Sequence, residues 1–150
     1  MTIIVGADHL GNELKRQVAR HLTGRGYEVI DLSPSDDEVD YPDVARAVAQ
    51  QVVDGKAEAA VLVCGTGIGM AIAANKIPGI RAANVSDPYS AERASGSNNA
   101  QILCLGAKVV GPELGCILVD HWLGVEFQEG RSARKVEKIN ALDRIRSAES

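Results

Sequence analysis

The most constraining feature of this sequence is the regular alternation of short apolar runs, rich in β-branched residues, with segments of helical periodicity. Runs of four to six residues that are apolar almost throughout are typical of strands covered on both faces of a parallel sheet. Strands that alternate with helices join into such a sheet through right-handed crossovers. We therefore predict one α/β domain over residues 1–150 with five strands: Thr2–Val5, Tyr27–Asp31, Ala59–Val63, Ile80–Val85 and Gln101–Leu105.

The segments between these runs carry helix signals. A first helix places Leu14, Val18 and Leu22 on one face and ends near Gly24. Pro42 opens a second helix, and Asp87 with Pro88 supplies an N-cap and first turn for another. The remaining predictions are a short Ala-rich helix after Gly69, helices over Pro112–Leu123 and Arg131–Arg146, and, on the last of these, an apolar stripe of Val136, Ile139, Leu142 and Ile145.

Bulk properties exclude several classes of function. The formal net charge of -4 argues against general nucleic-acid binding, which needs an excess of Lys and Arg. No apolar run approaches the roughly 20 residues that span a bilayer, and Met1 leads straight into a strand without a signal-peptide pattern. We therefore expect a cytoplasmic protein with no membrane partner. Three cysteines without a CxxC pair predict neither a disulfide framework nor a zinc site.

In open α/β sheets, ligands bind beyond the carboxyl ends of the strands. That rule selects three segments: Asp8-His9 after the first strand, Cys64–Gly69 after the third, and Ser86-Asp87 after the fourth. The first two of these segments hold the reactive side chains. We expect Asp8 either to contact sugar hydroxyls or merely to cap the next helix. His9 is a candidate ligand for phosphate.

The segment Cys64-Gly65-Thr66-Gly67-Ile68-Gly69 is the strongest candidate for chemistry. Its glycines allow a tight turn from strand to helix, where unpaired N–H groups and the helix dipole favour negative charge. The same field favours the thiolate of Cys64, a suitable base for removing a proton next to a carbonyl. The alternative is a buried structural cysteine beside a glycine-rich turn. The segment is neither a Walker A nor a GxGxxG motif, so it does not predict a nucleotide site.

Two other candidate segments each allow a functional and a purely structural interpretation. A basic cluster at the start of the last helix, formed by Arg131, Arg134, Lys135 and Lys138, either holds a phosphate or is a solvated helix face. Asn98-Asn99 either donates amides to an enediolate or caps a helix C-terminus. Cys104, inside a strand, and Cys116, on an apolar helix stripe, are predicted to be core residues.

Taken together, these motifs resemble the ribose-5-phosphate isomerase B / galactose-6-phosphate isomerase family. The resemblance runs over nearly the whole chain, in register. It rests on Gly6-Ala-Asp-His9, Asp40-Tyr-Pro42, Cys64-Gly-Thr-Gly-Ile-Gly69, Ala73-Ala-Asn-Lys76, Gly79-Ile-Arg-Ala82, Asn98-Asn-Ala100, Val109-Val-Gly111 and Gly130-Arg131.

The resemblance implies a Rossmann-like three-layer sandwich that forms a homodimer or homotetramer, with the last helix packed on a partner subunit. It implies active sites at the subunit interface, no cofactor and no metal, and a small phosphorylated sugar as the substrate. Cys64 and Thr66 match the catalytic positions, with Cys64 moving a proton between C1 and C2 through a cis-enediolate. The matching substrate-binding positions are Asp8, His9, Tyr41, Gly65, Gly67, Ile68, Gly69, Ser97, Asn98, Lys108, Arg131 and Lys135.

The chain departs from the family pattern at Ser97. Ribose-5-phosphate isomerases of this type carry there a histidine that opens the furanose ring, whereas a serine is a poor acid–base group at neutral pH. Two family arginines are also replaced, by Lys108 and Lys135, which keep the charge but lose the bidentate fork. A four-carbon sugar phosphorylated at O4 cannot close a furanose ring and needs no ring-opening acid.

The segments Tyr89–Arg93, Ser97–Gln101 and Gly130–Ala133 also resemble the branch that interconverts D-erythrulose 4-phosphate and D-erythrose 4-phosphate in tetritol catabolism. We therefore expect a tetrose-4-phosphate aldose–ketose isomerase. The alternatives are a ribose-5-phosphate isomerase, whose substrate opens spontaneously or through His9, and a hexose-6-phosphate isomerase. Outside this chemistry, the alternatives are a non-catalytic phosphosugar-binding subunit and a redox-sensing protein.

Overall fold

The structure, a computed structural model, describes residues 1–148, with side chains described through residue 145. Strands and helices alternate along the chain up to the last two helices, as the sequence predicts. The elements are β1 (Thr2–Ala7), α1 (Asn12–Gly24), β2 (Glu28–Asp31), α2 (Tyr41–Val53), β3 (Ala59–Cys64), α3 (Ile68–Ala74), β4 (Ala82–Asn84), α4 (Pro88–Gly96), β5 (Ile102–Gly106), α5 (Pro112–Leu123) and α6 (Arg131–Ala148).

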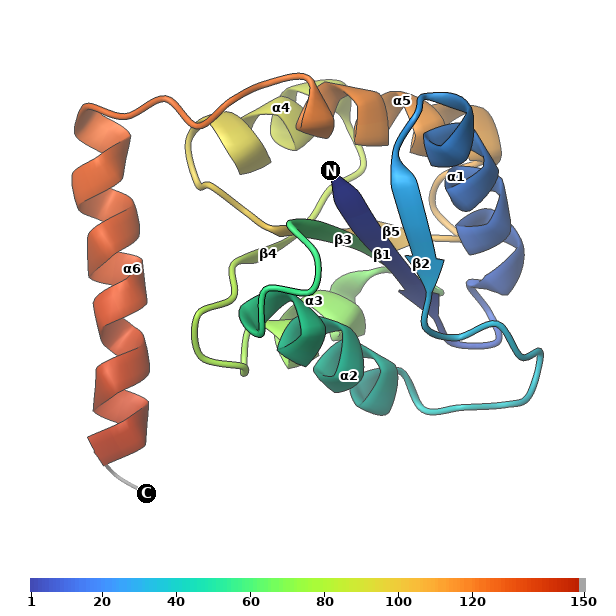
Figure 1. Cartoon of the computed structure of the whole chain (residues 1–150), viewed down its shortest axis with the longest axis horizontal. Coiled ribbons are helices and arrows are strands. Elements are labelled where there is room, and N and C mark those ends of the chain that lie inside the picture. Colours follow the sequence, from blue (N-terminus) through green and yellow to red (C-terminus); the bar gives the residue numbers. More distant parts are fainter. Residues whose placement is uncertain (149–150) are drawn as a thin grey trace.

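The five strands form one parallel sheet in the order β2-β1-β3-β5-β4, which confirms the predicted fold class. Helices cover both faces in a three-layer sandwich: α1, α4 and α5 lie on one side, and α2 and α3 on the other (Figure 1). β1 and β3 are neighbours although β2 lies between them in the chain. The connections therefore change direction at β1 and β3, which opens a crevice at the carboxyl ends of these two strands.

The predicted strand limits differ most at β4, which spans Ala82–Asn84 rather than Ile80–Val85. β4 is an edge strand that pairs only with β5. The side-chain amide of Asn75 accepts from the N–H of Ala82 at 2.8 Å and donates to its carbonyl oxygen at 2.9 Å. The outer edge of the strand is thus closed by a side chain rather than by another strand, which also protects it from pairing with other chains.

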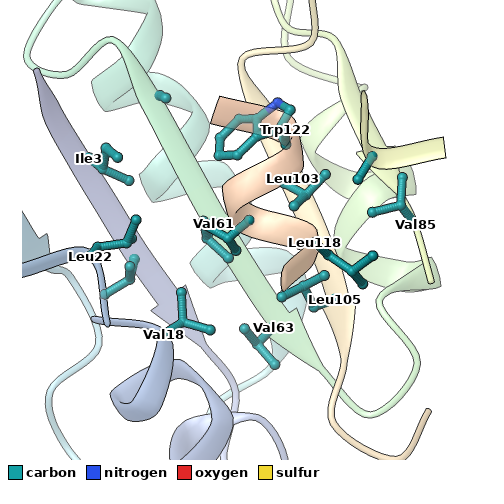
Figure 2. Packing of buried hydrophobic residues seen from close by; sticks show 14 of the residues in the cluster. Ile3, Val18, Leu22, Val61, Val63, Val85, Leu103, Leu105, Leu118 and Trp122 are labelled. Carbon is teal, nitrogen blue, oxygen red and sulfur yellow. The ribbon is translucent and has the colours of Figure 1, made fainter. Parts of the chain in front are cut away.

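Two aliphatic cores hold the layers together, one on each face of the sheet. Figure 2 shows the larger of them, in which Val61, Val63, Leu103 and Leu105 pack under helix residues such as Leu118. Trp122, the only tryptophan, is 2% exposed and donates its indole N–H to the carbonyl oxygen of Ala100 at 3.1 Å. Both faces of β3 are buried along its whole length, so Cys64 leaves the sheet at a rigid position.

Helix α6 stands to one side of the sandwich (Figure 1). Two hydrogen bonds tie it to the body: Arg81 donates to Asn140 Oδ1, and the N–H of Gly79 donates to Asp143 Oδ2, both at 2.8 Å. Of its predicted apolar stripe only Val136 is buried in the chain, at 5% exposure. The other three residues of the stripe are exposed, namely Ile139, Leu142 and Ile145.

Candidate active site

A cavity of about 460 Å³ lies in the crevice at the carboxyl ends of β1 and β3. Its walls come from the loops after β1, β3 and β5, from the start of α2 and from α3, as expected for an open parallel sheet. The residues that line it are Asp8, Leu10, Tyr41, Cys64, Gly65, Thr66, Ile68, Gly69, Ile72 and Lys108. One chain therefore brings most of the predicted carboxyl-end residues into a single hollow.

Cys64 is the last residue of β3 and is buried at 5% exposure. Its sulfur accepts a hydrogen bond from the N–H of Gly67 at 3.1 Å. This contact fixes the position of the sulfur at the edge of the cavity. Thr66 is exposed at the tip of the turn, where its Oγ1 accepts from the N–H of Ile68 at 3.2 Å.

Two glycines of the turn are required by what surrounds them. Gly67 has a φ of 82°, and a Cβ there would lie 2.5 Å from Asn84 Oδ1 and 2.9 Å from the Leu105 carbonyl carbon. A Cβ at Gly69 would lie 2.3 Å from Tyr41 Cε1, so the tyrosine ring lies directly against the backbone of the turn. The glycines thus allow the turn to pack tightly between its neighbours, which fixes the Cys64 sulfur.

Asp8 is buried beside the turn, and its Oδ1 accepts from the N–H groups of Leu10 and Gly11, both at 3.1 Å. It therefore shapes the loop before α1, whose N-cap is Gly11, while it also lines the cavity. The reading of Asp8 as the cap of α1 is wrong, because Gly11 is the N-cap and no side chain caps this helix. The carboxylate stabilises the loop that precedes the helix instead, and it lines the cavity where a sugar contact is predicted. His9 lies exposed at the same edge but does not line the cavity, whereas the exposed Lys108 does.

The remaining predicted site residues lie elsewhere in the chain. Ser97 and Asn98 follow α4, before β5 begins at Ile102, and so lie near the amino end of the sheet. Gly106, four residues beyond Ile102 along β5, pairs with Cys64. The strand advances about 13 Å over those four steps, so the two groups of residues stand at opposite ends. Arg131 and Lys135 are exposed on the first turns of α6.

The other two cysteines differ from each other. Cys104 is fully buried within β5, and burial raises the pKa of its thiol well above the ordinary value, so it is an inert core residue as predicted. Cys116 was predicted to be a core residue as well, and this is wrong: its side chain is only partly buried, beside the exposed N-terminal half of α5. Burial and the nearby carboxylates of Asp120 and Glu113 raise the pKa of the Cys116 thiol.

Sequence reasoning missed a buried cation behind the cavity. Lys15 of α1 is fully buried, with its Nζ 3.0 Å from Asp31 Oδ2 and donating to the carbonyl oxygen of Ser33. Ser33 Oγ in turn accepts from the N–H of Ala7 at 2.8 Å. This network joins the ends of β1 and β2 and holds the residue that precedes Asp8. The sequence did carry a signal for this buried cation, because Lys15 lies on the face of α1 that is otherwise mainly apolar.

Two further properties bear on the kind of site. Among the residues that the structure describes, no three His, Cys, Asp or Glu side chains gather in a way that could hold a metal ion. Within the same residues, none of the helices has the length and apolar character needed to cross a bilayer.

A model of the Ribose/Galactose Isomerase family matches residues 3–139. The chain belongs to this family. It is 49% identical over 141 residues to D-erythrulose-4-phosphate isomerase of Pectobacterium atrosepticum, with 93% of each chain covered. It is 44% identical over 146 residues to ribose-5-phosphate isomerase B of Escherichia coli, covering 97% of this chain and 98% of that one.

Solved structures agree with the family assignment. The ribose-5-phosphate isomerase B of Clostridium thermocellum superposes with a TM-score of 0.93 at 47% identity, covering 96% of this chain and 98% of that one. The enzyme of Mycoplasma genitalium, solved with bound ribulose-5-phosphate, gives a TM-score of 0.90 at 36% identity, with 95% and 96% covered. The predicted Rossmann-like fold is therefore confirmed, and the chain is a sugar-phosphate aldose–ketose isomerase.

Proposed function

We propose that this isomerase interconverts D-erythrulose 4-phosphate and D-erythrose 4-phosphate, as a step in tetritol catabolism. Cys64 carries the proposal, because it lines a sugar-sized cavity and its sulfur is held there by a hydrogen bond from the N–H of Gly67. The serine at position 97, where a ring-opening acid is expected for a pentose phosphate, supports the four-carbon substrate. Similarity to the Pectobacterium atrosepticum enzyme points the same way, while similarity to ribose-5-phosphate isomerase B leaves ribose 5-phosphate as the competing substrate.

In this mechanism the Cys64 thiolate removes the C1 proton of the ketose. The electron pair of that C–H bond moves into a C1–C2 double bond, which gives a cis-enediolate. The thiol then returns the proton to C2, and one proton moves between the two oxygens, so no oxidant, metal or cofactor is consumed. Thr66 and the turn amides stand where charge develops on these oxygens, and fixed donors aimed at such charge supply much of an enzyme's rate. Asp8 and Tyr41 line the sugar side of the cavity.

The proposed active site is shared between two chains of a homo-oligomer. Ser97 and Asn98 lie at the opposite end of the sheet from Cys64 of their own chain, and Arg131 and Lys135 lie on α6, which stands to one side of the sandwich. In the proposal they complete the site of a partner, where Asn98 supplies an amide donor and the two cations, with His9 and Lys108, hold the phosphate. A site shared between chains and a cluster that holds the phosphate both fit a cytoplasmic enzyme that acts on soluble sugar phosphates.

The test is a direct comparison of kcat/KM for D-erythrose 4-phosphate and D-ribose 5-phosphate with the purified enzyme, without added metal. We expect the tetrose to react much faster. Faster reaction of ribose 5-phosphate would reject the substrate while leaving Cys64 as the base. Absence of turnover with both sugars, together with saturable binding, would instead support a non-catalytic phosphosugar-binding subunit.

A further inference from the structure

Arg93, which the proposed mechanism does not use, organises the end of α4 where Ser97 and Asn98 lie. Its backbone carbonyl oxygen accepts from the N–H of Ser97 at 2.9 Å, the N–H of Asn98 at 3.2 Å and the Asn98 side-chain amide at 3.3 Å. Both partner-facing residues are thus bound to one residue. These bonds close the last turn of α4 through the backbone of residue 93, so Ser97 and Asn98 lie beside the point where the Arg93 side chain begins.

The Arg93 side chain folds back over the same turn. The side chain is 26% exposed, and its guanidinium donates through Nη1 to Ser97 Oγ at 3.0 Å and to Gln128 Oε1 at 3.3 Å. Nη2 pairs with Glu92 Oε1 at 3.0 Å, and Nε is buried with no hydrogen-bond partner among the described residues. Because the guanidinium of Arg93 donates to Ser97 Oγ from a position held by other contacts, it restricts the orientation of the Ser97 hydroxyl.

Gly96 makes this arrangement possible. A Cβ at Gly96 would lie 2.6 Å from Arg93 Nη2 and 3.0 Å from its Cζ, so any other residue there would displace the guanidinium. The carbonyl oxygen of Gly96 also accepts from the N–H of Gln128 at 2.9 Å, which brings the segment before α6 against the end of α4. Arg93, Gly96 and Ser97 therefore fit one another as a set.

The hydrogen bond decides what Ser97 offers to a ligand. Because Ser97 Oγ accepts from the guanidinium, its own proton is left to be donated outward. A hydroxyl with a positive charge 3.0 Å behind it suits an oxygen that is already anionic.

We propose that Arg93 is a specificity-determining residue, which fixes Ser97 as a hydrogen-bond donor to the phosphate group of a four-carbon substrate bound over the partner's catalytic cysteine. This inference rests on the proposed function, in which Ser97 takes the position of the ring-opening acid; an acid at that position acts on the ring oxygen, which is the oxygen on C4. In a tetrose 4-phosphate that oxygen carries the phosphoryl group. In a pentose 5-phosphate it is a hydroxyl that closes the furanose ring.

The first variant is Arg93→Met, which keeps a long apolar stem and removes the guanidinium. We expect kcat/KM for erythrose 4-phosphate to fall by about 10- to 100-fold, mainly through a higher KM, as for the loss of a hydrogen bond to a charged group. The inhibition constant of inorganic phosphate should rise in parallel, and kcat/KM for ribose 5-phosphate should change little. The matched control is Glu92→Gln, which removes the ion-pair partner of Arg93 and leaves its contacts with Ser97 and Gln128.

Equal losses on both sugars in Arg93→Met, or an unchanged phosphate inhibition constant, would overturn the role of Arg93. If that variant does not fold, Ser97→Ala tests the same donor, and an unchanged inhibition constant there has the same meaning. A preference of the wild-type enzyme for ribose 5-phosphate is a separate outcome: it rejects the tetrose substrate before any variant is made. The two failures are therefore distinguishable.

Discussion

The two ends of the sheet differ in how their polar residues are held. At the carboxyl end, Cys64 and Asp8 are buried, and their turns pack against backbone atoms so closely that glycine is required at Gly67. At the amino end, Asn98 is exposed, and the basic residues of α6 project from a helix that only a few contacts join to the body. The first end places its side chains around one cavity within a single chain. The second presents its side chains to the surface, as the proposed sharing of the site between chains requires.

The largest effect is expected from Cys64→Ala, which removes the proposed base from the carboxyl end. The kcat should fall by about 100- to 10,000-fold, the usual contribution of a positioned acid–base group. Binding of the sugar phosphate, measured by calorimetry, should persist, because the cavity walls remain. The matched control is Cys104→Ala, which deletes a buried thiol that packs near Cys64 but does not line the cavity, and it should lower stability rather than kcat. A fully active Cys64→Ala enzyme would contradict the assignment of the base.

The second prediction tests whether Cys64, at the carboxyl end of one chain, and Asn98, at the amino end of another, form one active site. Asn98→Ala should lower kcat by about 100-fold or more, as for removal of an oxyanion donor. If each site uses Cys64 of one chain and Asn98 of the other, mixing the two inactive variants, with subunit exchange, restores activity. Random pairing in a dimer leaves about a quarter of the sites intact, since each mixed dimer holds one complete site. Mixtures that stay inactive despite demonstrated exchange would place both residues in the site of one chain.

The third prediction sharpens the claim that the carboxyl end is tightly packed. Gly67→Ala and Gly55→Ala both place an alanine at a positive φ, of 82° and 77° respectively. The conformation alone should lower the free energy of unfolding by about 1–2 kcal/mol in each case. Only Gly67→Ala also meets close neighbours, whereas nothing lies within 4 Å of a Cβ at Gly55. We therefore expect Gly67→Ala to unfold at a lower denaturant concentration and to lose activity, while Gly55→Ala keeps its kcat. Equal stability and equal kcat of the two variants would show that the turn after Cys64 accommodates the added methyl group at little cost.

The smallest effect concerns α4, which runs from the carboxyl end back to Ser97. Asp87 caps this helix, and hydrogen bonds from Ser90 hold the pKa of Asp87 below its ordinary value. A lowered carboxylate pKa stabilises the fold above the pKa of the unfolded chain, and that stability is lost as the pH falls through the folded value. The Tm difference between wild type and Asp87→Ala should therefore be clear at pH 7 and shrink towards pH 3. With Asp87→Asn, which keeps an acceptor, the difference should be smaller at pH 7.

Much of the carboxyl end could be read from local sequence. Strands of continuous Val, Ile, Leu and Ala can only be buried on both faces, so their ends mark where loops and ligands meet. Cys64 and its glycines stand out because a strand-to-helix turn of that composition has a specific backbone geometry. The edge strand β4 was less predictable, because the side chain of Asn75 binds the backbone of Ala82, where the strand begins, and no sequence pattern indicates that contact.

The amino acid sequence by itself determined the fold class, the cysteine turn and the family, because each depends on short-range patterns or on motifs in fixed order. Only the tertiary structure decided which of those residues meet. It joined Asp8, Tyr41 and Lys108 to Cys64, placed Ser97 and Asn98 at the far end of the sheet, and folded Arg93 back over Ser97. The physical reason is that strand order and helix direction set distances between segments remote in the chain, and spacing along the sequence does not record those distances.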